Sequence, residues 1–234
     1  MQQDRRARLS RRGGLLAVGA AVGLAGVSAT APAAIGRTAA SVPSTRAIHL
    51  IGDSWAAGLF ADPSHALGQV AAAALGMTIT VDAISGTGYV ATAGAEDYLQ
   101  RAQEASGRHR LVIVQGGSND VGEDLDAIAA AATGTWRTLA RRFPAARLLA
   151  LGPGPDPEPV DADQRAVDAA LRRAVTAQGV PYVSMLDEDW IPAARASAVL
   201  GAITKHPTPA GQQYLGLRLA AAIRLIHPEV LTGV

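Results

Sequence analysis

The chain has 234 residues, of which 49% are hydrophobic and 18% charged, and its formal net charge is +1 at pH 7. This length suits one domain with a sizeable core, and the composition excludes an intrinsically disordered chain. The sequence has no basic stripe with interleaved aromatic residues and no cysteine, so we expect no nucleic-acid partner and no disulfides.

The first residues are typical of a secretory signal peptide. A basic stretch opens the chain, an uncharged apolar run follows over residues 15–29, and "TAPAA" supplies small side chains for cleavage. Within "SRRGGLL", Arg11 and Arg12 resemble the pair of a twin-arginine export signal. We therefore expect a secreted or extracytoplasmic protein. An uncleaved membrane anchor is the alternative, although the apolar run is short and rich in Gly and Ala.

The expected organisation is a signal peptide over residues 1–34, a linker over 35–46 and one domain over 47–234. Removing the signal peptide takes away five arginines and one aspartate, which changes the net charge from +1 to −3. The positive balance therefore belongs to the leader. On this interpretation the mature chain has no stable membrane span.

Five short apolar runs after the linker predict buried parallel strands. They cover residues 47–52, 77–85, 111–117, 146–152 and 180–186. Apolar spacings of three and four predict helices over 125–143 and 166–175, and a last helix after Gly211. This alternation favours an α/β fold: a three-layer α/β/α sandwich with a mainly parallel, about five-stranded sheet. Such sheets place their sites at the carboxyl ends of the strands.

Ser54 follows the first expected strand in "GDSWAAG", at a predicted turn from strand to helix. Its hydroxyl would face the edge of the sheet, where a helix dipole favours negative charge. Helix capping is the other role open to an isolated "GDS". After the second strand, "SGTGY" contains Gly86, whose backbone can approach a ligand closely and direct its N–H toward it.

The glycines of this second stretch also suggest a rival function. Gly86, Gly88 and Ala91 match a dinucleotide-binding fingerprint with alanine in the third place. That fingerprint requires an acidic residue at the end of the next strand, where this chain has Gln115 followed by two glycines. Nucleotide binding is therefore not favoured.

The third strand is followed by "GGSNDVG". The side-chain amide of Asn119 can donate to a developing oxyanion, and we expect Asp120 to cap the helix that follows. An Asx turn is the alternative. Later in the chain, "AITKHPTPAG" places His206 just before the last helix, where a catalytic base and a solvated loop histidine both remain open.

Taken in order, "GDSWAAG", "SGTG", "GSND" and "HPTPAG" resemble the four blocks of the SGNH (GDSL) hydrolases, and the resemblance extends from about residue 47 to residue 224. It implies a flavodoxin-like sandwich and a serine esterase or lipase. It implies Ser54 as the nucleophile and His206 as the general base and later acid. The backbone N–H groups of Ser54 and Gly86 would form the oxyanion hole with the Asn119 amide. Three preorganised donors suit a tetrahedral oxyanion.

One position departs from the family pattern, which has an aspartate three residues before the histidine. This chain has Ile203 there, which cannot orient an imidazole. Three explanations are open. A backbone carbonyl near Ile203 can hold the ring and leave a Ser–His dyad. Asp187 or Asp189 in "LDEDW" can serve as the orienting acid. Alternatively, the site has lost its activity and kept its cleft.

We therefore expect an exported serine esterase that acts on short acyl or acetyl esters of carbohydrate or lipid through an acyl-enzyme. The alternatives are a catalytically retired domain that binds carbohydrate or lipid, and an acyltransferase. We expect no cofactor, and no cluster of residues has metal-ligand spacing. The expected partner is a small-molecule, glycan or lipid ester, and the oligomeric state is left open.

Overall fold

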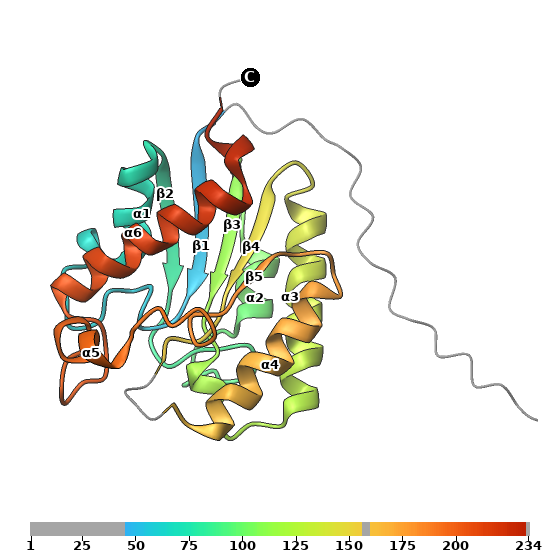
Figure 1. The fold of residues 1–234 in the computed structure, drawn as a ribbon. Helices are drawn as coiled ribbons and strands as arrows, with labels where there is room; N and C mark the ends of the chain where they lie inside the picture. The colour runs from blue at the N-terminus through green and yellow to red at the C-terminus, as the bar shows by residue number, and fades with distance from the viewer. Residues whose placement is uncertain (1–44, 156–159, 233–234) are drawn as a thin grey trace, which may run out of the picture. The chain divides into compact units, whose positions relative to one another are not determined.

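The computed structural model describes residues 45–155 and 160–232 (Figure 1). The expected signal peptide over 1–34 lies outside the described residues, as does the linker up to residue 44. Within the described part, no helix has both the length and the apolar character that a membrane crossing requires.

One parallel sheet runs through the domain in the strand order β2-β1-β3-β4-β5 (Figure 1). Its strands are β1 Ala47–Gly52, β2 Thr78–Ala83, β3 Leu111–Gln115, β4 Arg147–Leu151 and β5 Tyr182–Val183. Each neighbouring pair is parallel. Because β1 lies between β2 and β3, the loops that hold Ser54, Gly86 and Asn119 leave the sheet side by side at its carboxyl edge. The predicted fold class is confirmed.

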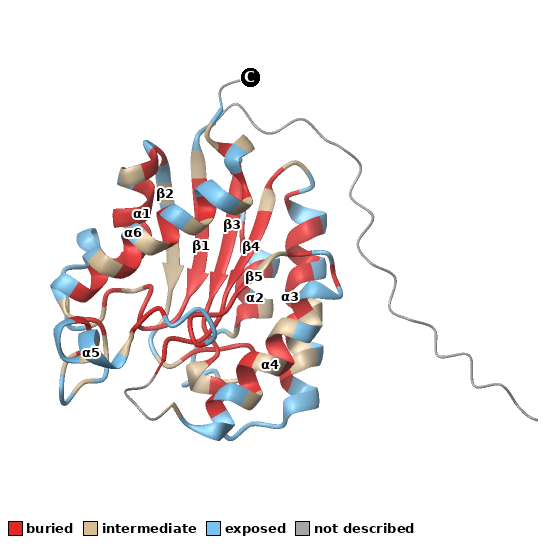
Figure 2. Ribbon diagram, in the orientation of Figure 1, coloured by how far each residue is buried: buried red, intermediate tan, exposed pale blue. Residues whose placement is uncertain are grey.

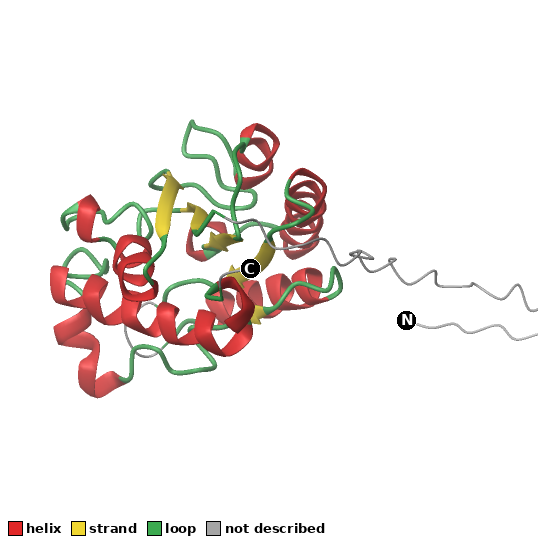
Figure 3. Cartoon of the chain, turned by 90° about the horizontal axis from the view of Figure 1, so that it is seen from above, coloured by secondary structure: helices red, strands yellow, loops and turns green. Residues whose placement is uncertain are grey.

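Helices cover both faces of this sheet (Figures 1 and 3). They are α1 Leu67–Leu75, α2 Tyr98–Glu104, α3 Leu125–Arg142, α4 Ala162–Thr176, α5 Ala193–Val199 and α6 Pro209–Ile226. Short 3-10 helices also occur: η1 Pro63–His65, η2 Ser118–Asp120 and η3 Pro228–Val230. On one face α6 packs against α1 and α5, and on the other α3 packs against α2 and α4.

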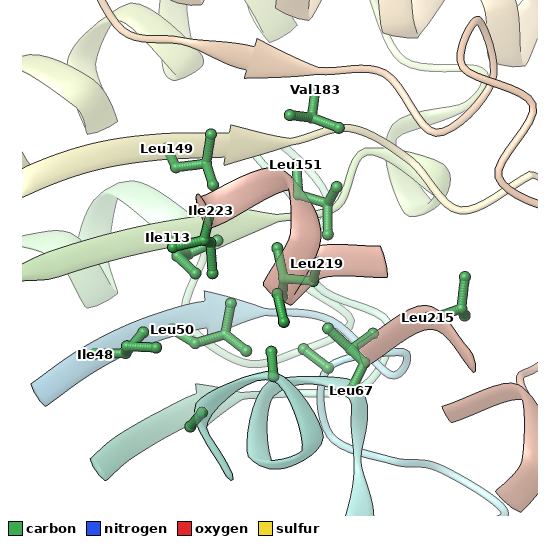
Figure 4. Close-up of a cluster of buried hydrophobic side chains, with 14 of the residues drawn as sticks. Ile48, Leu50, Leu67, Ile113, Leu149, Leu151, Val183, Leu215, Leu219 and Ile223 are labelled. Atoms are coloured by element: carbon green, nitrogen blue, oxygen red, sulfur yellow. The ribbon is translucent and has the colours of Figure 1, made fainter. Parts of the chain in front are cut away.

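Two apolar clusters fill the spaces between the layers, because alternate side chains of a strand point to opposite faces. Ile48 and Leu50 of β1 and Ile113 of β3 face the side covered by α1 and α6 (Figure 4). Ile51 and Val114 face the side covered by α2, α3 and α4. Figure 2 shows the central strands buried and the exposed residues on the outer faces of the helices. The carboxyl edge of the sheet is thus supported by apolar packing on both faces.

Two expected elements differ from the structure. The run over 180–186 contributes only Tyr182 and Val183 to the sheet. Pro181 has no N–H to donate before this strand, and after it the Ser184 carbonyl accepts from the Glu188 N–H at 3.1 Å in a turn. The helix expected directly after Ser54 is absent. Turns occupy residues 54–60 in its place, and the next α-helix begins at Leu67.

Candidate active site

Ser54 and His206 meet at the carboxyl edge of the sheet although 152 positions separate them in the chain. Ser54 stands just beyond β1 and is buried, and His206 lies in the loop between α5 and α6. Ser54 Oγ is 2.8 Å from His206 Nε2, a hydrogen-bond distance. When Nε2 accepts this bond, the imidazole is placed to take the hydroxyl proton, which is how a histidine activates a serine.

A backbone carbonyl holds the other nitrogen of the His206 ring. Nδ1 is 2.6 Å from the carbonyl oxygen of Thr204. Because a carbonyl only accepts, Nδ1 carries the proton and Nε2 is left as the acceptor for Ser54. The turn is held by the Gly201 N–H, which donates to the His206 carbonyl at 2.9 Å, and by the Lys205 N–H, which donates to the Gly201 carbonyl at 3.0 Å. This turn directs Ile203 into solvent, where 93% of its surface is exposed.

The two carboxylates of "LDEDW" have other neighbours. Asp187 forms an ion pair with Arg172, which also pairs with the buried Asp168. Asp189 has a positive φ of 45°, and its backbone carbonyl accepts a hydrogen bond from the Arg218 side chain. Within residues 45–155 and 160–232, His206 has no hydrogen bond or ion pair with either carboxylate. The geometry therefore brings the Thr204 carbonyl to Nδ1 and leaves both carboxylates elsewhere.

Potential oxyanion donors lie on the strand ends beside Ser54. The Asn119 side-chain nitrogen donates one N–H to the Thr87 carbonyl at 2.9 Å, which orients the amide and leaves its second N–H for a ligand. Gly86 precedes Thr87 with a φ of +79°, a conformation that disfavours other residues. In the described part of the chain, the backbone N–H groups of Ser54 and Gly86 donate to no other protein group. Three donors from three neighbouring loops are thus available.

Asp120 shapes the Gly86 loop and does not cap the following helix, so that expectation was wrong. Its buried carboxylate accepts hydrogen bonds of 2.8 to 2.9 Å from three successive backbone N–H groups, those of Tyr89, Val90 and Ala91. Asp124 is the N-cap of α3 instead. The carboxylate approaches so closely that a Cβ at Gly88 would lie 2.5 Å from its oxygens. Asp120 therefore ties the turn of Asn119 to the loop that follows β2.

Arg101 of α2 ties the same loop to the end of β1. Its guanidinium is buried and donates to the Gly52 carbonyl at 3.1 Å, to the Asp82 carbonyl at 2.8 Å and to the Thr87 hydroxyl at 2.9 Å. The guanidinium also lies over the ring of Tyr98, 4.9 Å from its centroid. One planar cation thus fixes the strand end before Ser54 relative to the loop of Gly86.

Asp53 places a carboxyl group directly beside the candidate nucleophile and is 1% exposed. Its Oδ1 accepts from the Trp55 N–H at 2.8 Å and, with the amide oriented to suit both its neighbours, from the Gln115 side chain at 3.0 Å. Its Oδ2 has no partner among the described residues. Burial raises the pKa of Asp53 from 3.8 to about 7, and the two hydrogen bonds oppose that rise only in part. This carboxyl group therefore titrates near neutral pH.

A cavity of about 240 Å³ lies beside Ser54 and His206. Its lining is mostly polar and comprises Asp53, Ser54, Trp55, Ser118, Asn119, Val121, Gly154, Asp161, Gln164, Lys205 and His206. The Trp55 ring forms an apolar wall against Gly154, where a Cβ would lie 2.4 Å from the ring. The Ser118 hydroxyl and the Gln164 amide both donate to the Gly154 carbonyl, at 3.2 and 2.8 Å. This wall of the cavity is thus held in place.

Three contributors to the site were not apparent from the sequence. The Thr204 carbonyl belongs to the backbone and has no sequence signature. Arg101 acts from a helix outside every motif, although an arginine on the buried face of "YLQRAQE" is an unusual signal. Phe60 lies six positions beyond Ser54, and its ring meets the His206 imidazole edge-on with the centroids 5.4 Å apart. In the residues that the structure describes, no three His, Cys, Asp or Glu side chains gather as a metal site.

Comparison with protein-family models matches residues 50–214 to the GDSL-like Lipase/Acylhydrolase family. The match covers more than half of the chain, from within β1 to within α6, and includes Ser54, Gly86, Asn119 and His206. No curated protein matches the chain.

Solved structures share the fold at low sequence identity. A carbohydrate esterase family 2 enzyme plus carbohydrate binding domain from Corynascus thermopiles (Myceliophthora fergusii) is 23% identical with a TM-score of 0.59, over 80% of this chain and 67% of that one. A family two carbohydrate esterase from Clostridium thermocellum in complex with cellohexaose is 20% identical with a TM-score of 0.64, over 80% and 66%. A protein from Lactobacillus plantarum is 19% identical with a TM-score of 0.62, over 80% and 99%. The chain thus spans about two thirds of the length of the two esterase chains.

The family match and the parallel five-stranded sheet agree with the four motifs at the carboxyl edge. The chain therefore belongs to the GDSL-like lipase/acylhydrolase family and is a hydrolase that acts on esters.

Proposed function

We propose that this protein is an exported serine esterase that hydrolyses short acyl esters through a Ser54–His206 dyad. The observation that carries the proposal is the pair of contacts on one imidazole, with Nε2 2.8 Å from the Ser54 hydroxyl and Nδ1 2.6 Å from the Thr204 carbonyl. Export is supported by the basic, apolar and small-residue segments of residues 1–34, the proposed signal peptide, with the catalytic domain over 47–234.

The reaction begins when Nε2 of His206 takes the proton of Ser54 and the serine oxygen attacks the ester carbonyl carbon. The carbonyl oxygen becomes an oxyanion that accepts hydrogen bonds from the Ser54 and Gly86 amides and the Asn119 side chain. The imidazolium then gives its proton to the leaving alcohol, and an acyl-enzyme remains. Water, deprotonated by His206, attacks the acyl carbon. The tetrahedral intermediate collapses to the carboxylic acid as the imidazolium returns its proton to the Ser54 oxygen.

The Thr204 carbonyl takes over the positional role of a triad aspartate. In trypsin, replacing the triad aspartate by its amide lowers kcat by about 10⁴ because the imidazole is held in the wrong tautomer. A carbonyl acceptor at Nδ1 holds the correct tautomer, and its partial negative charge faces the imidazolium as it forms. The dyad therefore keeps the orientation that catalysis needs and gives up only the full charge of a carboxylate.

The cavity supports a short acyl group. Drug-sized ligands occupy pockets of roughly 300 to 1,000 Å³, and this cavity holds about 240 Å³. Ser118, Gln164 and Lys205 give much of its wall a polar character, which disfavours burying a long alkyl chain. An alcohol from carbohydrate is supported by the Clostridium thermocellum esterase, whose structure contains cellohexaose. Acetyl or other short acyl groups on carbohydrate are the proposed substrates.

Hydrolysis of a chromogenic ester series from acetyl to dodecanoyl tests this function. We expect acetyl and butyryl esters to be hydrolysed fastest, with kcat/KM falling at least 100-fold in both Ser54→Ala and His206→Ala. Asp187→Ala and Asp189→Ala are the matched controls and should retain the rate within about threefold. A wild-type rate equal to that of Ser54→Ala on every ester would leave a domain that only binds its ligand. Transfer of the acyl group to an added alcohol, at a rate above that of hydrolysis, would make the protein an acyltransferase.

A further inference from the structure

Phe60 contacts the His206 imidazole and is nevertheless largely exposed to solvent. Its ring meets the His206 ring edge-on at a centroid distance of 5.4 Å, yet 63% of its surface is exposed. An isolated exposed aromatic residue needs no explanation on a protein surface. One that touches the proposed general base does, because any substrate bound to Ser54 has to pass close to it.

The backbone at Phe60 is also in a conformation that bulky side chains avoid. Its φ is +64°, in the left-handed region that is mainly occupied by glycine, asparagine and aspartate. The turn that imposes this angle starts at the nucleophile: the Ala57 N–H donates to the Asp53 carbonyl at 2.9 Å and the Leu59 N–H to the Ser54 carbonyl at 3.0 Å. The Ala61 N–H closes the turn on the Gly58 carbonyl at 2.9 Å. Phe60 is therefore presented to solvent from a turn fixed to Ser54.

The positions of the oxyanion donors and of His206 decide which half of an ester lies near Phe60. The oxyanion is held on the side of Asn119 and Gly86, whereas the leaving alcohol has to lie beside Nε2 of His206, since it receives its proton from that atom. Phe60 is absent from the residues that line the cavity and contacts the imidazole instead. An acyl group that fills the cavity thus leaves the alcohol half to extend from Nε2 of His206 toward the Phe60 ring at the edge of the cavity.

Resting on the proposed function, we infer that Phe60 is a specificity-determining residue that binds the alcohol half of the ester and favours cyclic alcohols such as sugar rings. A flat aromatic face offers an apolar surface to the C–H groups on one face of such a ring, and a short acyclic alcohol covers little of it. The hydrogen-bonded turn sets the backbone at Phe60 before the substrate arrives, so little backbone freedom has to be lost on binding.

Acetate esters of ethanol, cyclohexanol and methyl glucopyranoside test the inference, with acid release followed by pH-stat titration on the full protein. In Phe60→Ala the ratio of kcat/KM for the two cyclic esters to that for ethyl acetate should fall about tenfold, which corresponds to about 1.4 kcal/mol. Phe60→Trp keeps a flat ring and should retain the wild-type ratio. Ile203→Ala is the matched control, since it removes an exposed apolar side chain from the His206 loop, and its ratio should equal that of the wild type.

The remaining outcomes distinguish the inference from the function on which it rests. A uniform loss of rate on all three acetates in Phe60→Ala, with an unchanged ratio, would overturn the inference and make Phe60 a support for the imidazole. A changed ratio between ethyl octanoate and ethyl acetate, with the alcohol ratio intact, would place Phe60 on the acyl side and also overturn it. Absence of Ser54-dependent hydrolysis of every ester in the wild type would instead remove the proposed function.

Discussion

Replacing Asp53 by asparagine should change stability in a pH-dependent way, because the buried carboxyl group binds its proton more tightly in the folded protein. Its pKa rises from 3.8 to about 7 on folding, chiefly through burial. Between these two values the folded state holds a proton that the unfolded state has released, so wild-type stability falls as the pH rises toward 7. Above pH 7 the folded protein contains a buried carboxylate whose Oδ2 has no described partner.

The size of the effect follows from the shift. Each pKa unit corresponds to 1.36 kcal/mol, so the whole shift amounts to about 4 kcal/mol, of which about 3 kcal/mol falls between pH 5 and pH 8. Asp53→Asn keeps an oxygen that can accept from the Trp55 N–H and the Gln115 amide, and it remains neutral throughout. The stability of Asp53→Asn minus that of the wild type should therefore be about 3 kcal/mol larger at pH 8 than at pH 5.

Urea unfolding followed by tryptophan fluorescence at pH 5 and pH 8 measures this difference. The contributions of the other titrating groups are common to both proteins and cancel when the variant is compared with the wild type. Equal m-values for the two proteins would establish that they unfold between comparable states. A stability difference that is the same at both pH values would refute the reasoning, because it would mean that folding leaves the Asp53 proton affinity unchanged.

Three further predictions concern Arg101, His49 of β1 and Ile203. Arg101→Lys should lower kcat by about 10 to 100-fold with little change in KM, because a lysine cannot bridge Gly52 and Thr87 with one planar group. Steady-state kinetics measure both constants. A larger change in KM than in kcat would contradict this positioning role. Both ring nitrogens of His49 are buried and have no hydrogen-bond partner among the described residues, and burial lowers the pKa of His49 from 6.5 to about 4. The folded state therefore resists a proton that the unfolded state accepts, so the free energy of unfolding falls as the pH drops below 6.5. The stability of His49→Leu minus that of the wild type should therefore be about 2 kcal/mol larger at pH 5 than at pH 8. A difference in urea unfolding that does not change with pH would contradict this. Ile203→Asp should raise kcat/KM on acetyl esters by no more than about threefold, since the side chain points into solvent and the Thr204 carbonyl already holds Nδ1; a rise of tenfold or more would show that a carboxylate at this position reaches the ring.

The layered fold could be predicted because its signals are local. Buried parallel strands need apolar runs, and those over 47–52 and 111–117 contain β1 and β3 as observed. The last helix was predicted to follow Gly211 but begins at Pro209, because Thr208 caps it and proline is suited to the first turn. The apolar run over 180–186 was predicted to be one strand, but only Tyr182 and Val183 belong to the sheet. Its other apolar residues are buried without being part of a strand.

The candidate site was predictable where side chains carry the chemistry and unpredictable where contacts across the fold do. Ser54 and His206 could be picked out by their motifs, and the structure brings them together. The partner of Nδ1 is a backbone carbonyl, which any residue at position 204 would supply. Asp120 was expected to cap a local helix, but its carboxylate reaches back about thirty positions to the loop of Tyr89. Such tertiary contacts leave no periodic pattern in the sequence.

The central claim is that His206, held by a backbone carbonyl, activates Ser54 for covalent catalysis. It is tested most directly by the intact mass and peptide map of the protein after reaction with a fluorophosphonate probe. The account predicts one adduct, located on Ser54, that is absent in Ser54→Ala, forms at least 100-fold more slowly in His206→Ala and forms at the wild-type rate in Asp187→Ala and Asp189→Ala. An unmodified Ser54 in the folded wild-type protein, or an adduct that forms equally fast without His206, would contradict it.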